Sequence, residues 1–393
     1  MKKDSFIFKF SKQPGAKPFE GDIVRVPNFL DKTTPIGSHS FVLNGDASAV
    51  DFSDSGEAIK YIQFGNTTKF PSADKMPTGF DPDTVLEGGK NPGLHIRDLH
   101  KAGITGKGIT VAIIDQALNT EHTEIKDSII HYESIGYAEN KKADYHGTAV
   151  SSLLAGKTLG VAPDTKIVYF AANNLTSGYG GEKPLKMGEV DVYFANYATA
   201  LRKILFMNAR LPKDKKISAV SISWGMLGAN EECTKLINQL IESGVMVLTT
   251  DSYRFYGDNS AFITIDRRMN SNADDIESYD VGFWQKNIKQ INNRLLVPAG
   301  GRTIAGFYNN EHYIYCGANA GMSWSTPYLV GVYALAKQIM PNLTPKHFFE
   351  IAHQTSVSND KVGNNVIIQP QKIIERLQTE KILQQQNVEA KSM

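Results

Sequence analysis

The sequence predicts an α/β fold with a doubly wound, mostly parallel sheet and helices on both of its faces. Two observations support this fold class. Continuous apolar runs of strand length recur along the chain, which is typical of strands buried on both faces. Amphipathic or small-residue segments of helical length separate these runs. Such an alternation favours parallel βαβ units.

The alternation begins at residue 94, where the segment 94–103 has helical spacing and stops at Gly103. The apolar runs predict strands over 109–114, 166–172, 219–224 and 244–250. Helical segments are predicted over 148–156, 190–206, 233–243, 323–340 and 341–355. Residues 94–375 are therefore expected to form one large α/β domain, followed by a polar C-terminal tail over 376–393 that resembles a frayed helix.

Residues 1–93 form an N-terminal extension rich in Gly, Pro, Ser and Asp. Its last part, 75–93, has the Pro and Gly punctuation of a loop or linker. The sequence leaves open whether this extension is propeptide-like, and inhibits or assists folding, or is an integral part of the fold.

Composition excludes several functional classes. The chain has 42 basic and 41 acidic side chains, so no global charge attracts nucleic acid or an anionic membrane. No run approaches the ~18 apolar residues of a membrane span. The apolar run in MKKDSFIFKF is too short for a secretory signal, and two cysteines cannot form a disulfide framework. These features predict a cytoplasmic protein with no nucleic-acid or membrane partner, while its oligomeric state stays open.

Cofactor motifs are absent from the sequence as well. GITGKGIT (103–110) lacks the Gly-Lys-Ser/Thr ending of a phosphate loop, and no GxGxxG follows the strand at 109–114. EHTEI (121–125) lacks the second histidine of a zinc helix. The acidic segment 272–280 has no EF-hand spacing, so a solvated loop is favoured over a structural calcium site. We expect no cofactor and no catalytic metal.

Three residues together suggest nucleophilic catalysis. Asp115 ends a predicted parallel strand, at the sheet edge where open α/β folds bind ligands. His146 carries the side chain best suited to proton transfer near neutral pH. Ser323 begins a predicted helix, where unpaired backbone N–H groups and the helix dipole stabilise a developing oxyanion. Each residue taken alone also has an ordinary structural interpretation as a turn former or helix-start residue.

The motifs around these residues resemble those of the subtilisin-like serine peptidases, or subtilases. GKGITVAIIDQ is similar to the family's aspartate motif, HGTAVSSLLAG to its histidine motif and GMSWSTPYLVG to its serine motif. They occur in the order Asp, His, Ser that subtilisin has, in contrast to the orders in chymotrypsin and in the α/β-hydrolases. The resemblance covers most of residues 94–375. It implies that Ser323 attacks the scissile carbonyl, His146 transfers the proton and Asp115 orients the imidazole.

The same resemblance implies where a peptide binds. SISWG (221–225) is similar to the strand that pairs with an extended substrate, so Ser223, Trp224 and Gly225 are predicted to contact it. NNLTSGYGG (173–181) stands at the other substrate-flanking edge and adds Gly178 and Gly180, although its glycines are equally consistent with an ordinary loop.

The oxyanion hole departs from the family pattern. Subtilases usually supply an Asn side chain shortly after the strand that here spans 244–250, but this chain continues DSYRFYGDNS. Tyr253 falls at the expected position, and Ser252 and Asn259 are further candidate donors beside the Ser323 backbone N–H. Losing the amide donor typically costs about 10²–10³ in turnover. Within the serine motif, Trp324 stands where the family commonly has Met, and Tyr328 stands where it often has His.

The resemblance therefore implies a serine endopeptidase that acts through an acyl-enzyme on peptide or protein substrates. Narrow specificity is a further hypothesis, because a cytoplasmic protease must be restrained by its specificity, its compartment or a propeptide. The alternative is a catalytically weakened homologue that binds a peptide or a protein partner, because the expected oxyanion Asn is missing.

Overall fold

A five-stranded, entirely parallel sheet forms the centre of the computed structural model, which describes residues 41–42, 45–137, 142–172, 187–225, 227–281, 292–318 and 320–392. The strand order is β4-β5-β3-β6-β7. The bounds are β3 Thr110–Asp115, β4 Ile129–Ser134, β5 Lys166–Ala171, β6 Ile217–Ile222 and β7 Met246–Thr249. The predicted α/β fold class with a mostly parallel sheet is confirmed. Strand β4 was missed because its mixed polar composition lacks a continuous apolar run.

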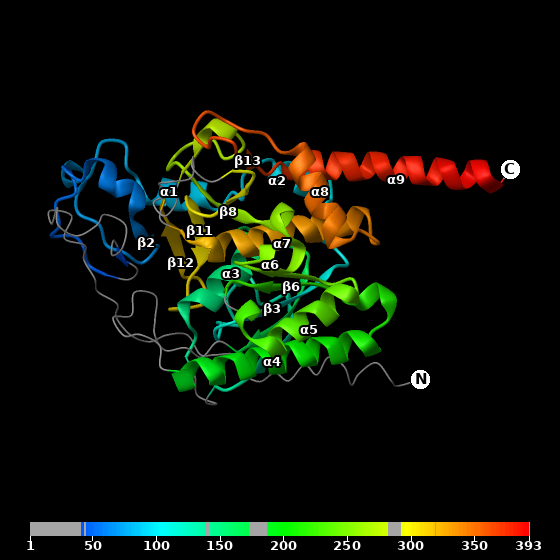
Figure 1. Cartoon of the computed structure of the whole chain (residues 1–393). Helices are drawn as coiled ribbons and strands as arrows, with labels where there is room; N and C mark the ends of the chain where they lie inside the picture. The colour runs from blue at the N-terminus through cyan, green and yellow to red at the C-terminus, as the bar shows by residue number, and fades with distance from the viewer. Residues whose placement is uncertain are drawn as a thin grey trace.

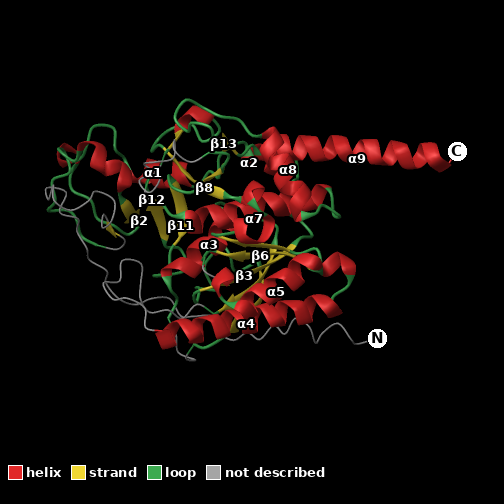
Figure 2. Cartoon of the chain, in the orientation of Figure 1, coloured by secondary structure: helices red, strands yellow, loops and turns green. Residues whose placement is uncertain are grey.

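Helices cover both faces of this sheet (Figure 2). Helices α3 (Tyr145–Ala155) and α7 (Met322–Ile339) pack on one face, and α4 (Met187–Arg210) and α5 (Glu231–Glu242) pack on the other. Strand β3 shows why both faces need cover. Its side chains alternate, so Val111 and Ile113 join one hydrophobic core while Ala112 and Ile114 join the other.

Two smaller sheets flank the central one. One has the order β13-β10-β8-β9 and the other β1-β2-β12-β11. The first contains β8 Phe262–Arg267, β9 Tyr279–Asp280, β10 Leu295–Pro298 and β13 Val366–Ile367. The second contains β1 Phe41–Val42, β2 Gln63–Gly65, β11 Arg302–Ala305 and β12 Tyr313–Cys316. The second sheet thus combines strands of the N-terminal extension with strands that precede Ser323.

The interpretation of 75–93 as a loop or linker is wrong, because these residues include helix α1 (Pro82–Gly89). Asp81 accepts a hydrogen bond from the Thr84 backbone N–H at 2.6 Å, which caps the helix N-terminus. Pro82 stands at the first helical position, where its missing N–H costs little. The Pro and Gly residues that suggested a loop therefore stand at the two ends of a short helix.

The remaining helices are α2 (Ile96–Lys101), α6 (Tyr253–Tyr256), α8 (Pro345–Thr355) and α9 (Pro370–Ser392). The predicted C-terminal tail is the outer part of α9, which Figure 1 shows extending away from the body of the molecule. None of the described helices combines the length and the apolar character that a bilayer crossing requires.

Asp266, the fifth residue of β8, is a buried carboxylate with few partners. Its Oδ1 accepts a hydrogen bond from the Gly300 backbone N–H at 2.6 Å, and its Oδ2 has no hydrogen-bond partner within the described ranges. Burial raises the pKa of Asp266 from the ordinary 3.8 to about 7, and the charge of Asp280 adds to this effect.

This raised pKa predicts a pH-dependent stability. Between pH 3.8 and about 7 the folded chain holds a proton on Asp266 that the unfolded chain releases, so the free energy of unfolding falls as pH rises through this window. Asp266→Asn cannot ionise. Its stability relative to the wild type is expected to increase between pH 5 and pH 8 by on the order of 3 kcal/mol. Urea denaturation at both pH values measures this, with the exposed Asp214→Asn as control. An equal difference at both pH values contradicts the assignment.

Candidate active site

The predicted site residues lie at the carboxyl edge of the central sheet. Asp115 is the last residue of β3, and Ser223 follows the last residue of the neighbouring strand β6. His146 is the second residue of α3, and Ser323 is the second residue of α7. Because β3 and β6 are parallel, their carboxyl ends meet at one edge, and the two helix starts pack over it.

Asp115 and His146 form a buried pair. The His146 Nδ1 lies 2.7 Å from Asp115 Oδ1, and both residues are 2% exposed. The same carboxylate oxygen accepts the Gln116 backbone N–H at 2.7 Å. Since an ionised carboxylate can only accept, Nδ1 must be the donor. This bond sets the tautomer in which Nε2 is the basic nitrogen of the imidazole.

Gly147 allows α3 to begin close to the end of β3. A Cβ at this position would lie 2.3 Å from the Gln116 carbonyl oxygen and 2.4 Å from the Tyr169 hydroxyl. The Tyr169 hydroxyl donates to that same carbonyl. His146 therefore reaches Asp115 because the residue after it has no side chain.

Ser323 is held against the predicted substrate strand. Its hydroxyl donates to the Ser223 carbonyl at 3.1 Å, and the buried Ser223 hydroxyl donates to the Ser323 carbonyl at 2.9 Å. Two residues further along α7, Ser325 donates to the Val297 carbonyl of β10 at 2.8 Å. These bonds attach the first turn of α7 to the residue that follows β6 and to β10.

Aromatic rings connect the histidine helix to the serine helix. Trp324, next to Ser323, has its ring centroid 5.2 Å from that of His146. Tyr145, just before His146, lies 5.8 Å from the same Trp324 ring. Sequence reasoning did not select Tyr145. Its position directly before the histidine motif, as an aromatic residue, was the signal in the sequence that could have identified it.

The other predicted substrate residues have identifiable surroundings. Trp224 packs against Tyr193 of α4 with centroids 5.7 Å apart, and its carbonyl accepts the Thr250 backbone N–H at 3.3 Å. Gly225 lies beside the Thr250 hydroxyl, which would be 2.9 Å from a Cβ at that position. Gly178 and Gly180 lie outside the described residues.

The three candidate oxyanion side chains differ in availability. The Ser252 hydroxyl is buried and donates to the Ser260 carbonyl at 2.8 Å. Asn259 is exposed, and its carbonyl receives a bond from His353 at 2.7 Å. Tyr253 begins α6 with 47% exposure, and its ring lies under Arg254. Their roles stay predictions.

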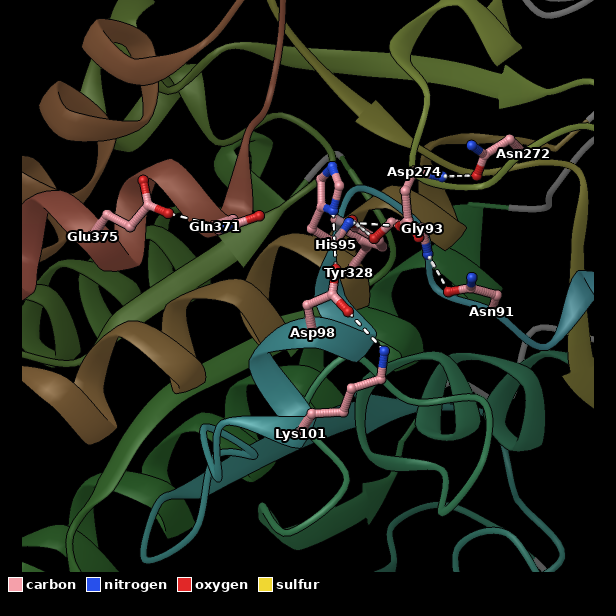
Figure 3. A network of polar contacts seen from close by, with 10 residues as sticks. All are labelled: Asn91, Gly93, His95, Asp98, Lys101, Asn272, Asp274, Tyr328, Gln371 and Glu375. Carbon is pink, nitrogen blue, oxygen red and sulfur yellow. Dashed lines mark hydrogen bonds and ion pairs between the residues drawn. The ribbon is translucent and has the colours of Figure 1, made fainter.

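In the acidic segment 272–280, two of the aspartate side chains accept hydrogen bonds from backbone groups. Asp274 Oδ1 accepts the His95 N–H at 2.7 Å (Figure 3), and Asp275 Oδ1 accepts the Glu277 N–H at 2.9 Å. Across the described parts of the chain, no three His, Cys, Asp or Glu side chains are grouped to hold a metal ion.

Comparison with known proteins gives matches to serine proteases. A model of the subtilase family matches residues 106–262, which include Asp115 and His146 and end before Ser323. The major intracellular serine protease of Bacillus subtilis is 24% identical over 246 residues, 60% of this chain and 70% of that protein. A probable subtilase-type serine protease of Deinococcus radiodurans is 24% identical over 313 residues, 69% of this chain and 40% of that protein. A solved structure, the serine protease MycP1, an essential component of the type VII (ESX-1) secretion system, has a TM-score of 0.49 and 16% identity over 73% of this chain and 89% of that one.

Gly147→Ala is expected to push α3 away from β3. The added methyl meets a backbone carbonyl that cannot move freely, so we expect a loss of about 1–3 kcal/mol in the free energy of unfolding. Gly188→Ala is the matched control, because a Cβ there meets nothing within 4 Å and Ala favours a helix. Denaturant unfolding compares the two variants. Equal effects would contradict the close packing of Gly147.

Proposed function

The chain belongs to the subtilase family, and we propose that it is a serine endopeptidase with Asp115, His146 and Ser323 as its catalytic triad. The observation that carries this proposal is the buried 2.7 Å bond between His146 and Asp115, at the edge where Ser323 lies against β6. The Trp324 ring, in contact with the imidazole, supports the proximity of the histidine and serine helices.

The triad chemistry assigns one role to each residue. Ser323 Oγ attacks the scissile carbonyl and becomes acylated, while His146 takes its proton and then gives that proton to the leaving amine. Asp115 keeps the imidazole oriented and stabilises its protonated form. Water then attacks the acyl-enzyme, with His146 again as the base. The burial of Asp115 strengthens this electrostatic contribution, because little water screens it.

The substrate proposed is an extended peptide segment that lies along residues 223–225. Main-chain pairing at such an edge recognises backbone first and side chains second. The large Trp324 ring beside the imidazole supports a narrow substrate range. Broad degradation of unfolded casein by the purified protein would count against that narrow range.

For the oxyanion we propose two donors, the backbone N–H at the start of α7 and the Tyr253 hydroxyl. Helix α7 spans 18 residues, so its N-terminus carries a full helix dipole. Among the three candidate side chains, Ser252 already donates to another carbonyl, whereas Tyr253 is exposed and so is accessible to a bound substrate.

The triad is tested with a fluorophosphonate, detected as an adduct by intact mass. We expect a stoichiometric adduct on the wild type and none on Ser323→Ala or His146→Ala. Asp115→Asn keeps the shape but favours the wrong tautomer, so labelling and peptide hydrolysis should slow by about 10⁴. Tight peptide binding without any adduct would contradict the enzyme and favour the binding-protein alternative.

The oxyanion proposal is tested by removing one hydroxyl at a time. Tyr253→Phe is expected to lower kcat by about 10- to 100-fold, because a donor to the transition state is lost. Ser252→Ala removes the bond to Ser260 and should reduce stability while kcat stays within about threefold. Peptide hydrolysis and thermal unfolding are measured on both. An unchanged kcat in Tyr253→Phe would exclude that hydroxyl as a donor.

A further inference from the structure

Strand β2 of the N-terminal extension lies inside a sheet. In the order β1-β2-β12-β11 it pairs antiparallel with β12, with Gln63 opposite Cys316 and Phe64 opposite Tyr315. Beyond the strand, the Gly317 N–H donates to the Ile62 carbonyl at 3.1 Å. Removal of the extension would expose the edge of β12, a few residues before Ser323.

Apolar side chains of the extension form a core with that strand. The residues buried together are Ala47, Phe52, Ile62, Phe64, Met76, Val85, Leu86 and Tyr315. Phe64 packs against Tyr315 of β12 at a centroid distance of 5.6 Å. Because this core combines side chains of the extension with Tyr315 of β12, separating the extension from β12 would expose apolar surface to water.

A buried arginine binds the end of helix α1. Arg267 is 4% exposed and donates to the carbonyls of Gly88 at 2.9 Å, Asn91 at 3.0 Å and Gly301 at 2.8 Å. Two of these three acceptors belong to the extension. Without the extension the guanidinium would lose two of these three hydrogen bonds, which is unfavourable.

The junction between the extension and the α/β domain is a buried turn. Gly93, Leu94 and His95 all have positive φ, at 82°, 51° and 62°. Asp274 accepts the His95 N–H, and the Tyr328 hydroxyl donates to the Gly93 carbonyl at 3.5 Å (Figure 3). A peptidase binds an extended segment, so this left-handed turn is unsuited to processing.

The extension also reaches residues that adjoin the proposed triad. The Tyr145 hydroxyl donates to Gln63 Oε1 at 3.3 Å and lies 3.3 Å from Cys316 Sγ. Burial raises the pKa of the Cys316 thiol to about 12, and hydrogen bonds from Tyr145 and Trp324 to its sulfur partly offset this effect. Paired strands β2 and β12 therefore contact the residue before His146 and the residue after Ser323.

We propose that residues 45–93 remain in the active enzyme and position its two catalytic helices, with Gln63 as a positioning residue. This inference rests on the proposed function, since positioning is meaningful only if the triad is catalytic. It decides between the two fates that the sequence left open for the extension.

The retention is tested by native mass spectrometry of the fluorophosphonate-labelled protein, which counts a nicked but bound segment as present. We expect the adduct on particles that contain residues 45–93. An adduct only on particles that lack them overturns the inference, whereas no adduct on any particle overturns the proposed function instead.

Hydrogen exchange on full-length Ser323→Ala tests, in a protein without catalysis, whether the extension stays paired with the chain that follows β12. The Gly317 and Ala318 amides, which donate to the Ile62 and Lys60 carbonyls, should exchange as slowly as those of β3. Exchange as fast as in an exposed peptide would overturn the inference whether or not the protein is an enzyme.

Positioning is tested by Gln63→Met, which keeps the side-chain length and removes the amide oxygen. We expect kcat to fall about tenfold with KM within about twofold, because the helix geometry shifts while substrate contacts remain. Asn66→Ala is the matched control, since it removes side-chain bonds to Glu311 and Tyr313 at the far end of the same strand pair. Equal falls in kcat for both variants would show general loosening and overturn the role of Gln63.

Discussion

The buried bond between Asp115 and His146 is the interaction on which the rest of the site depends. Taking a carboxylate out of water is costly, and removing one partner of such a pair typically costs about 3–5 kcal/mol. The surrounding structure is arranged to keep that pair together. Gly147 lets α3 approach the end of β3, and the Gln116 N–H supplies a further bond to the carboxylate. A geometry held this firmly orients the imidazole before any substrate arrives.

The serine side of the site depends on a different set of contacts. Ser323 sits at a helix start held by reciprocal bonds to Ser223 and by the Ser325 bond to β10. The chain that leads into this helix comes from β12, and one edge of β12 pairs with β2 of the extension. The two small sheets therefore hold α7 in place, because one contacts it directly and the other pairs with the segment before it.

Much of the α/β domain was predictable because its signals are local. The buried strands appear as apolar runs, and the helix at 94–103 and the long helix α4 appear as periodic segments. Strand β4 escaped because one polar face interrupts its apolar run. Helix α1 was mistaken for a linker because Asp81-Pro82 is both a turn signal and a helix start, and only the packing of Val85 and Leu86 against the domain distinguishes the two.

The sequence by itself determined the fold class, the family resemblance and the three residues proposed as the triad, since these depend on residue type and order. Tertiary structure decided which other side chains meet them. Trp324 contacts His146, and Gln63 reaches Tyr145 across 82 positions of sequence. The tertiary structure also places the Ser252 hydroxyl where it donates to the Ser260 carbonyl, and it leaves Tyr253 exposed. Such contacts join segments far apart in the chain, and no local pattern encodes them because they arise only when separate strands pair and helices pack.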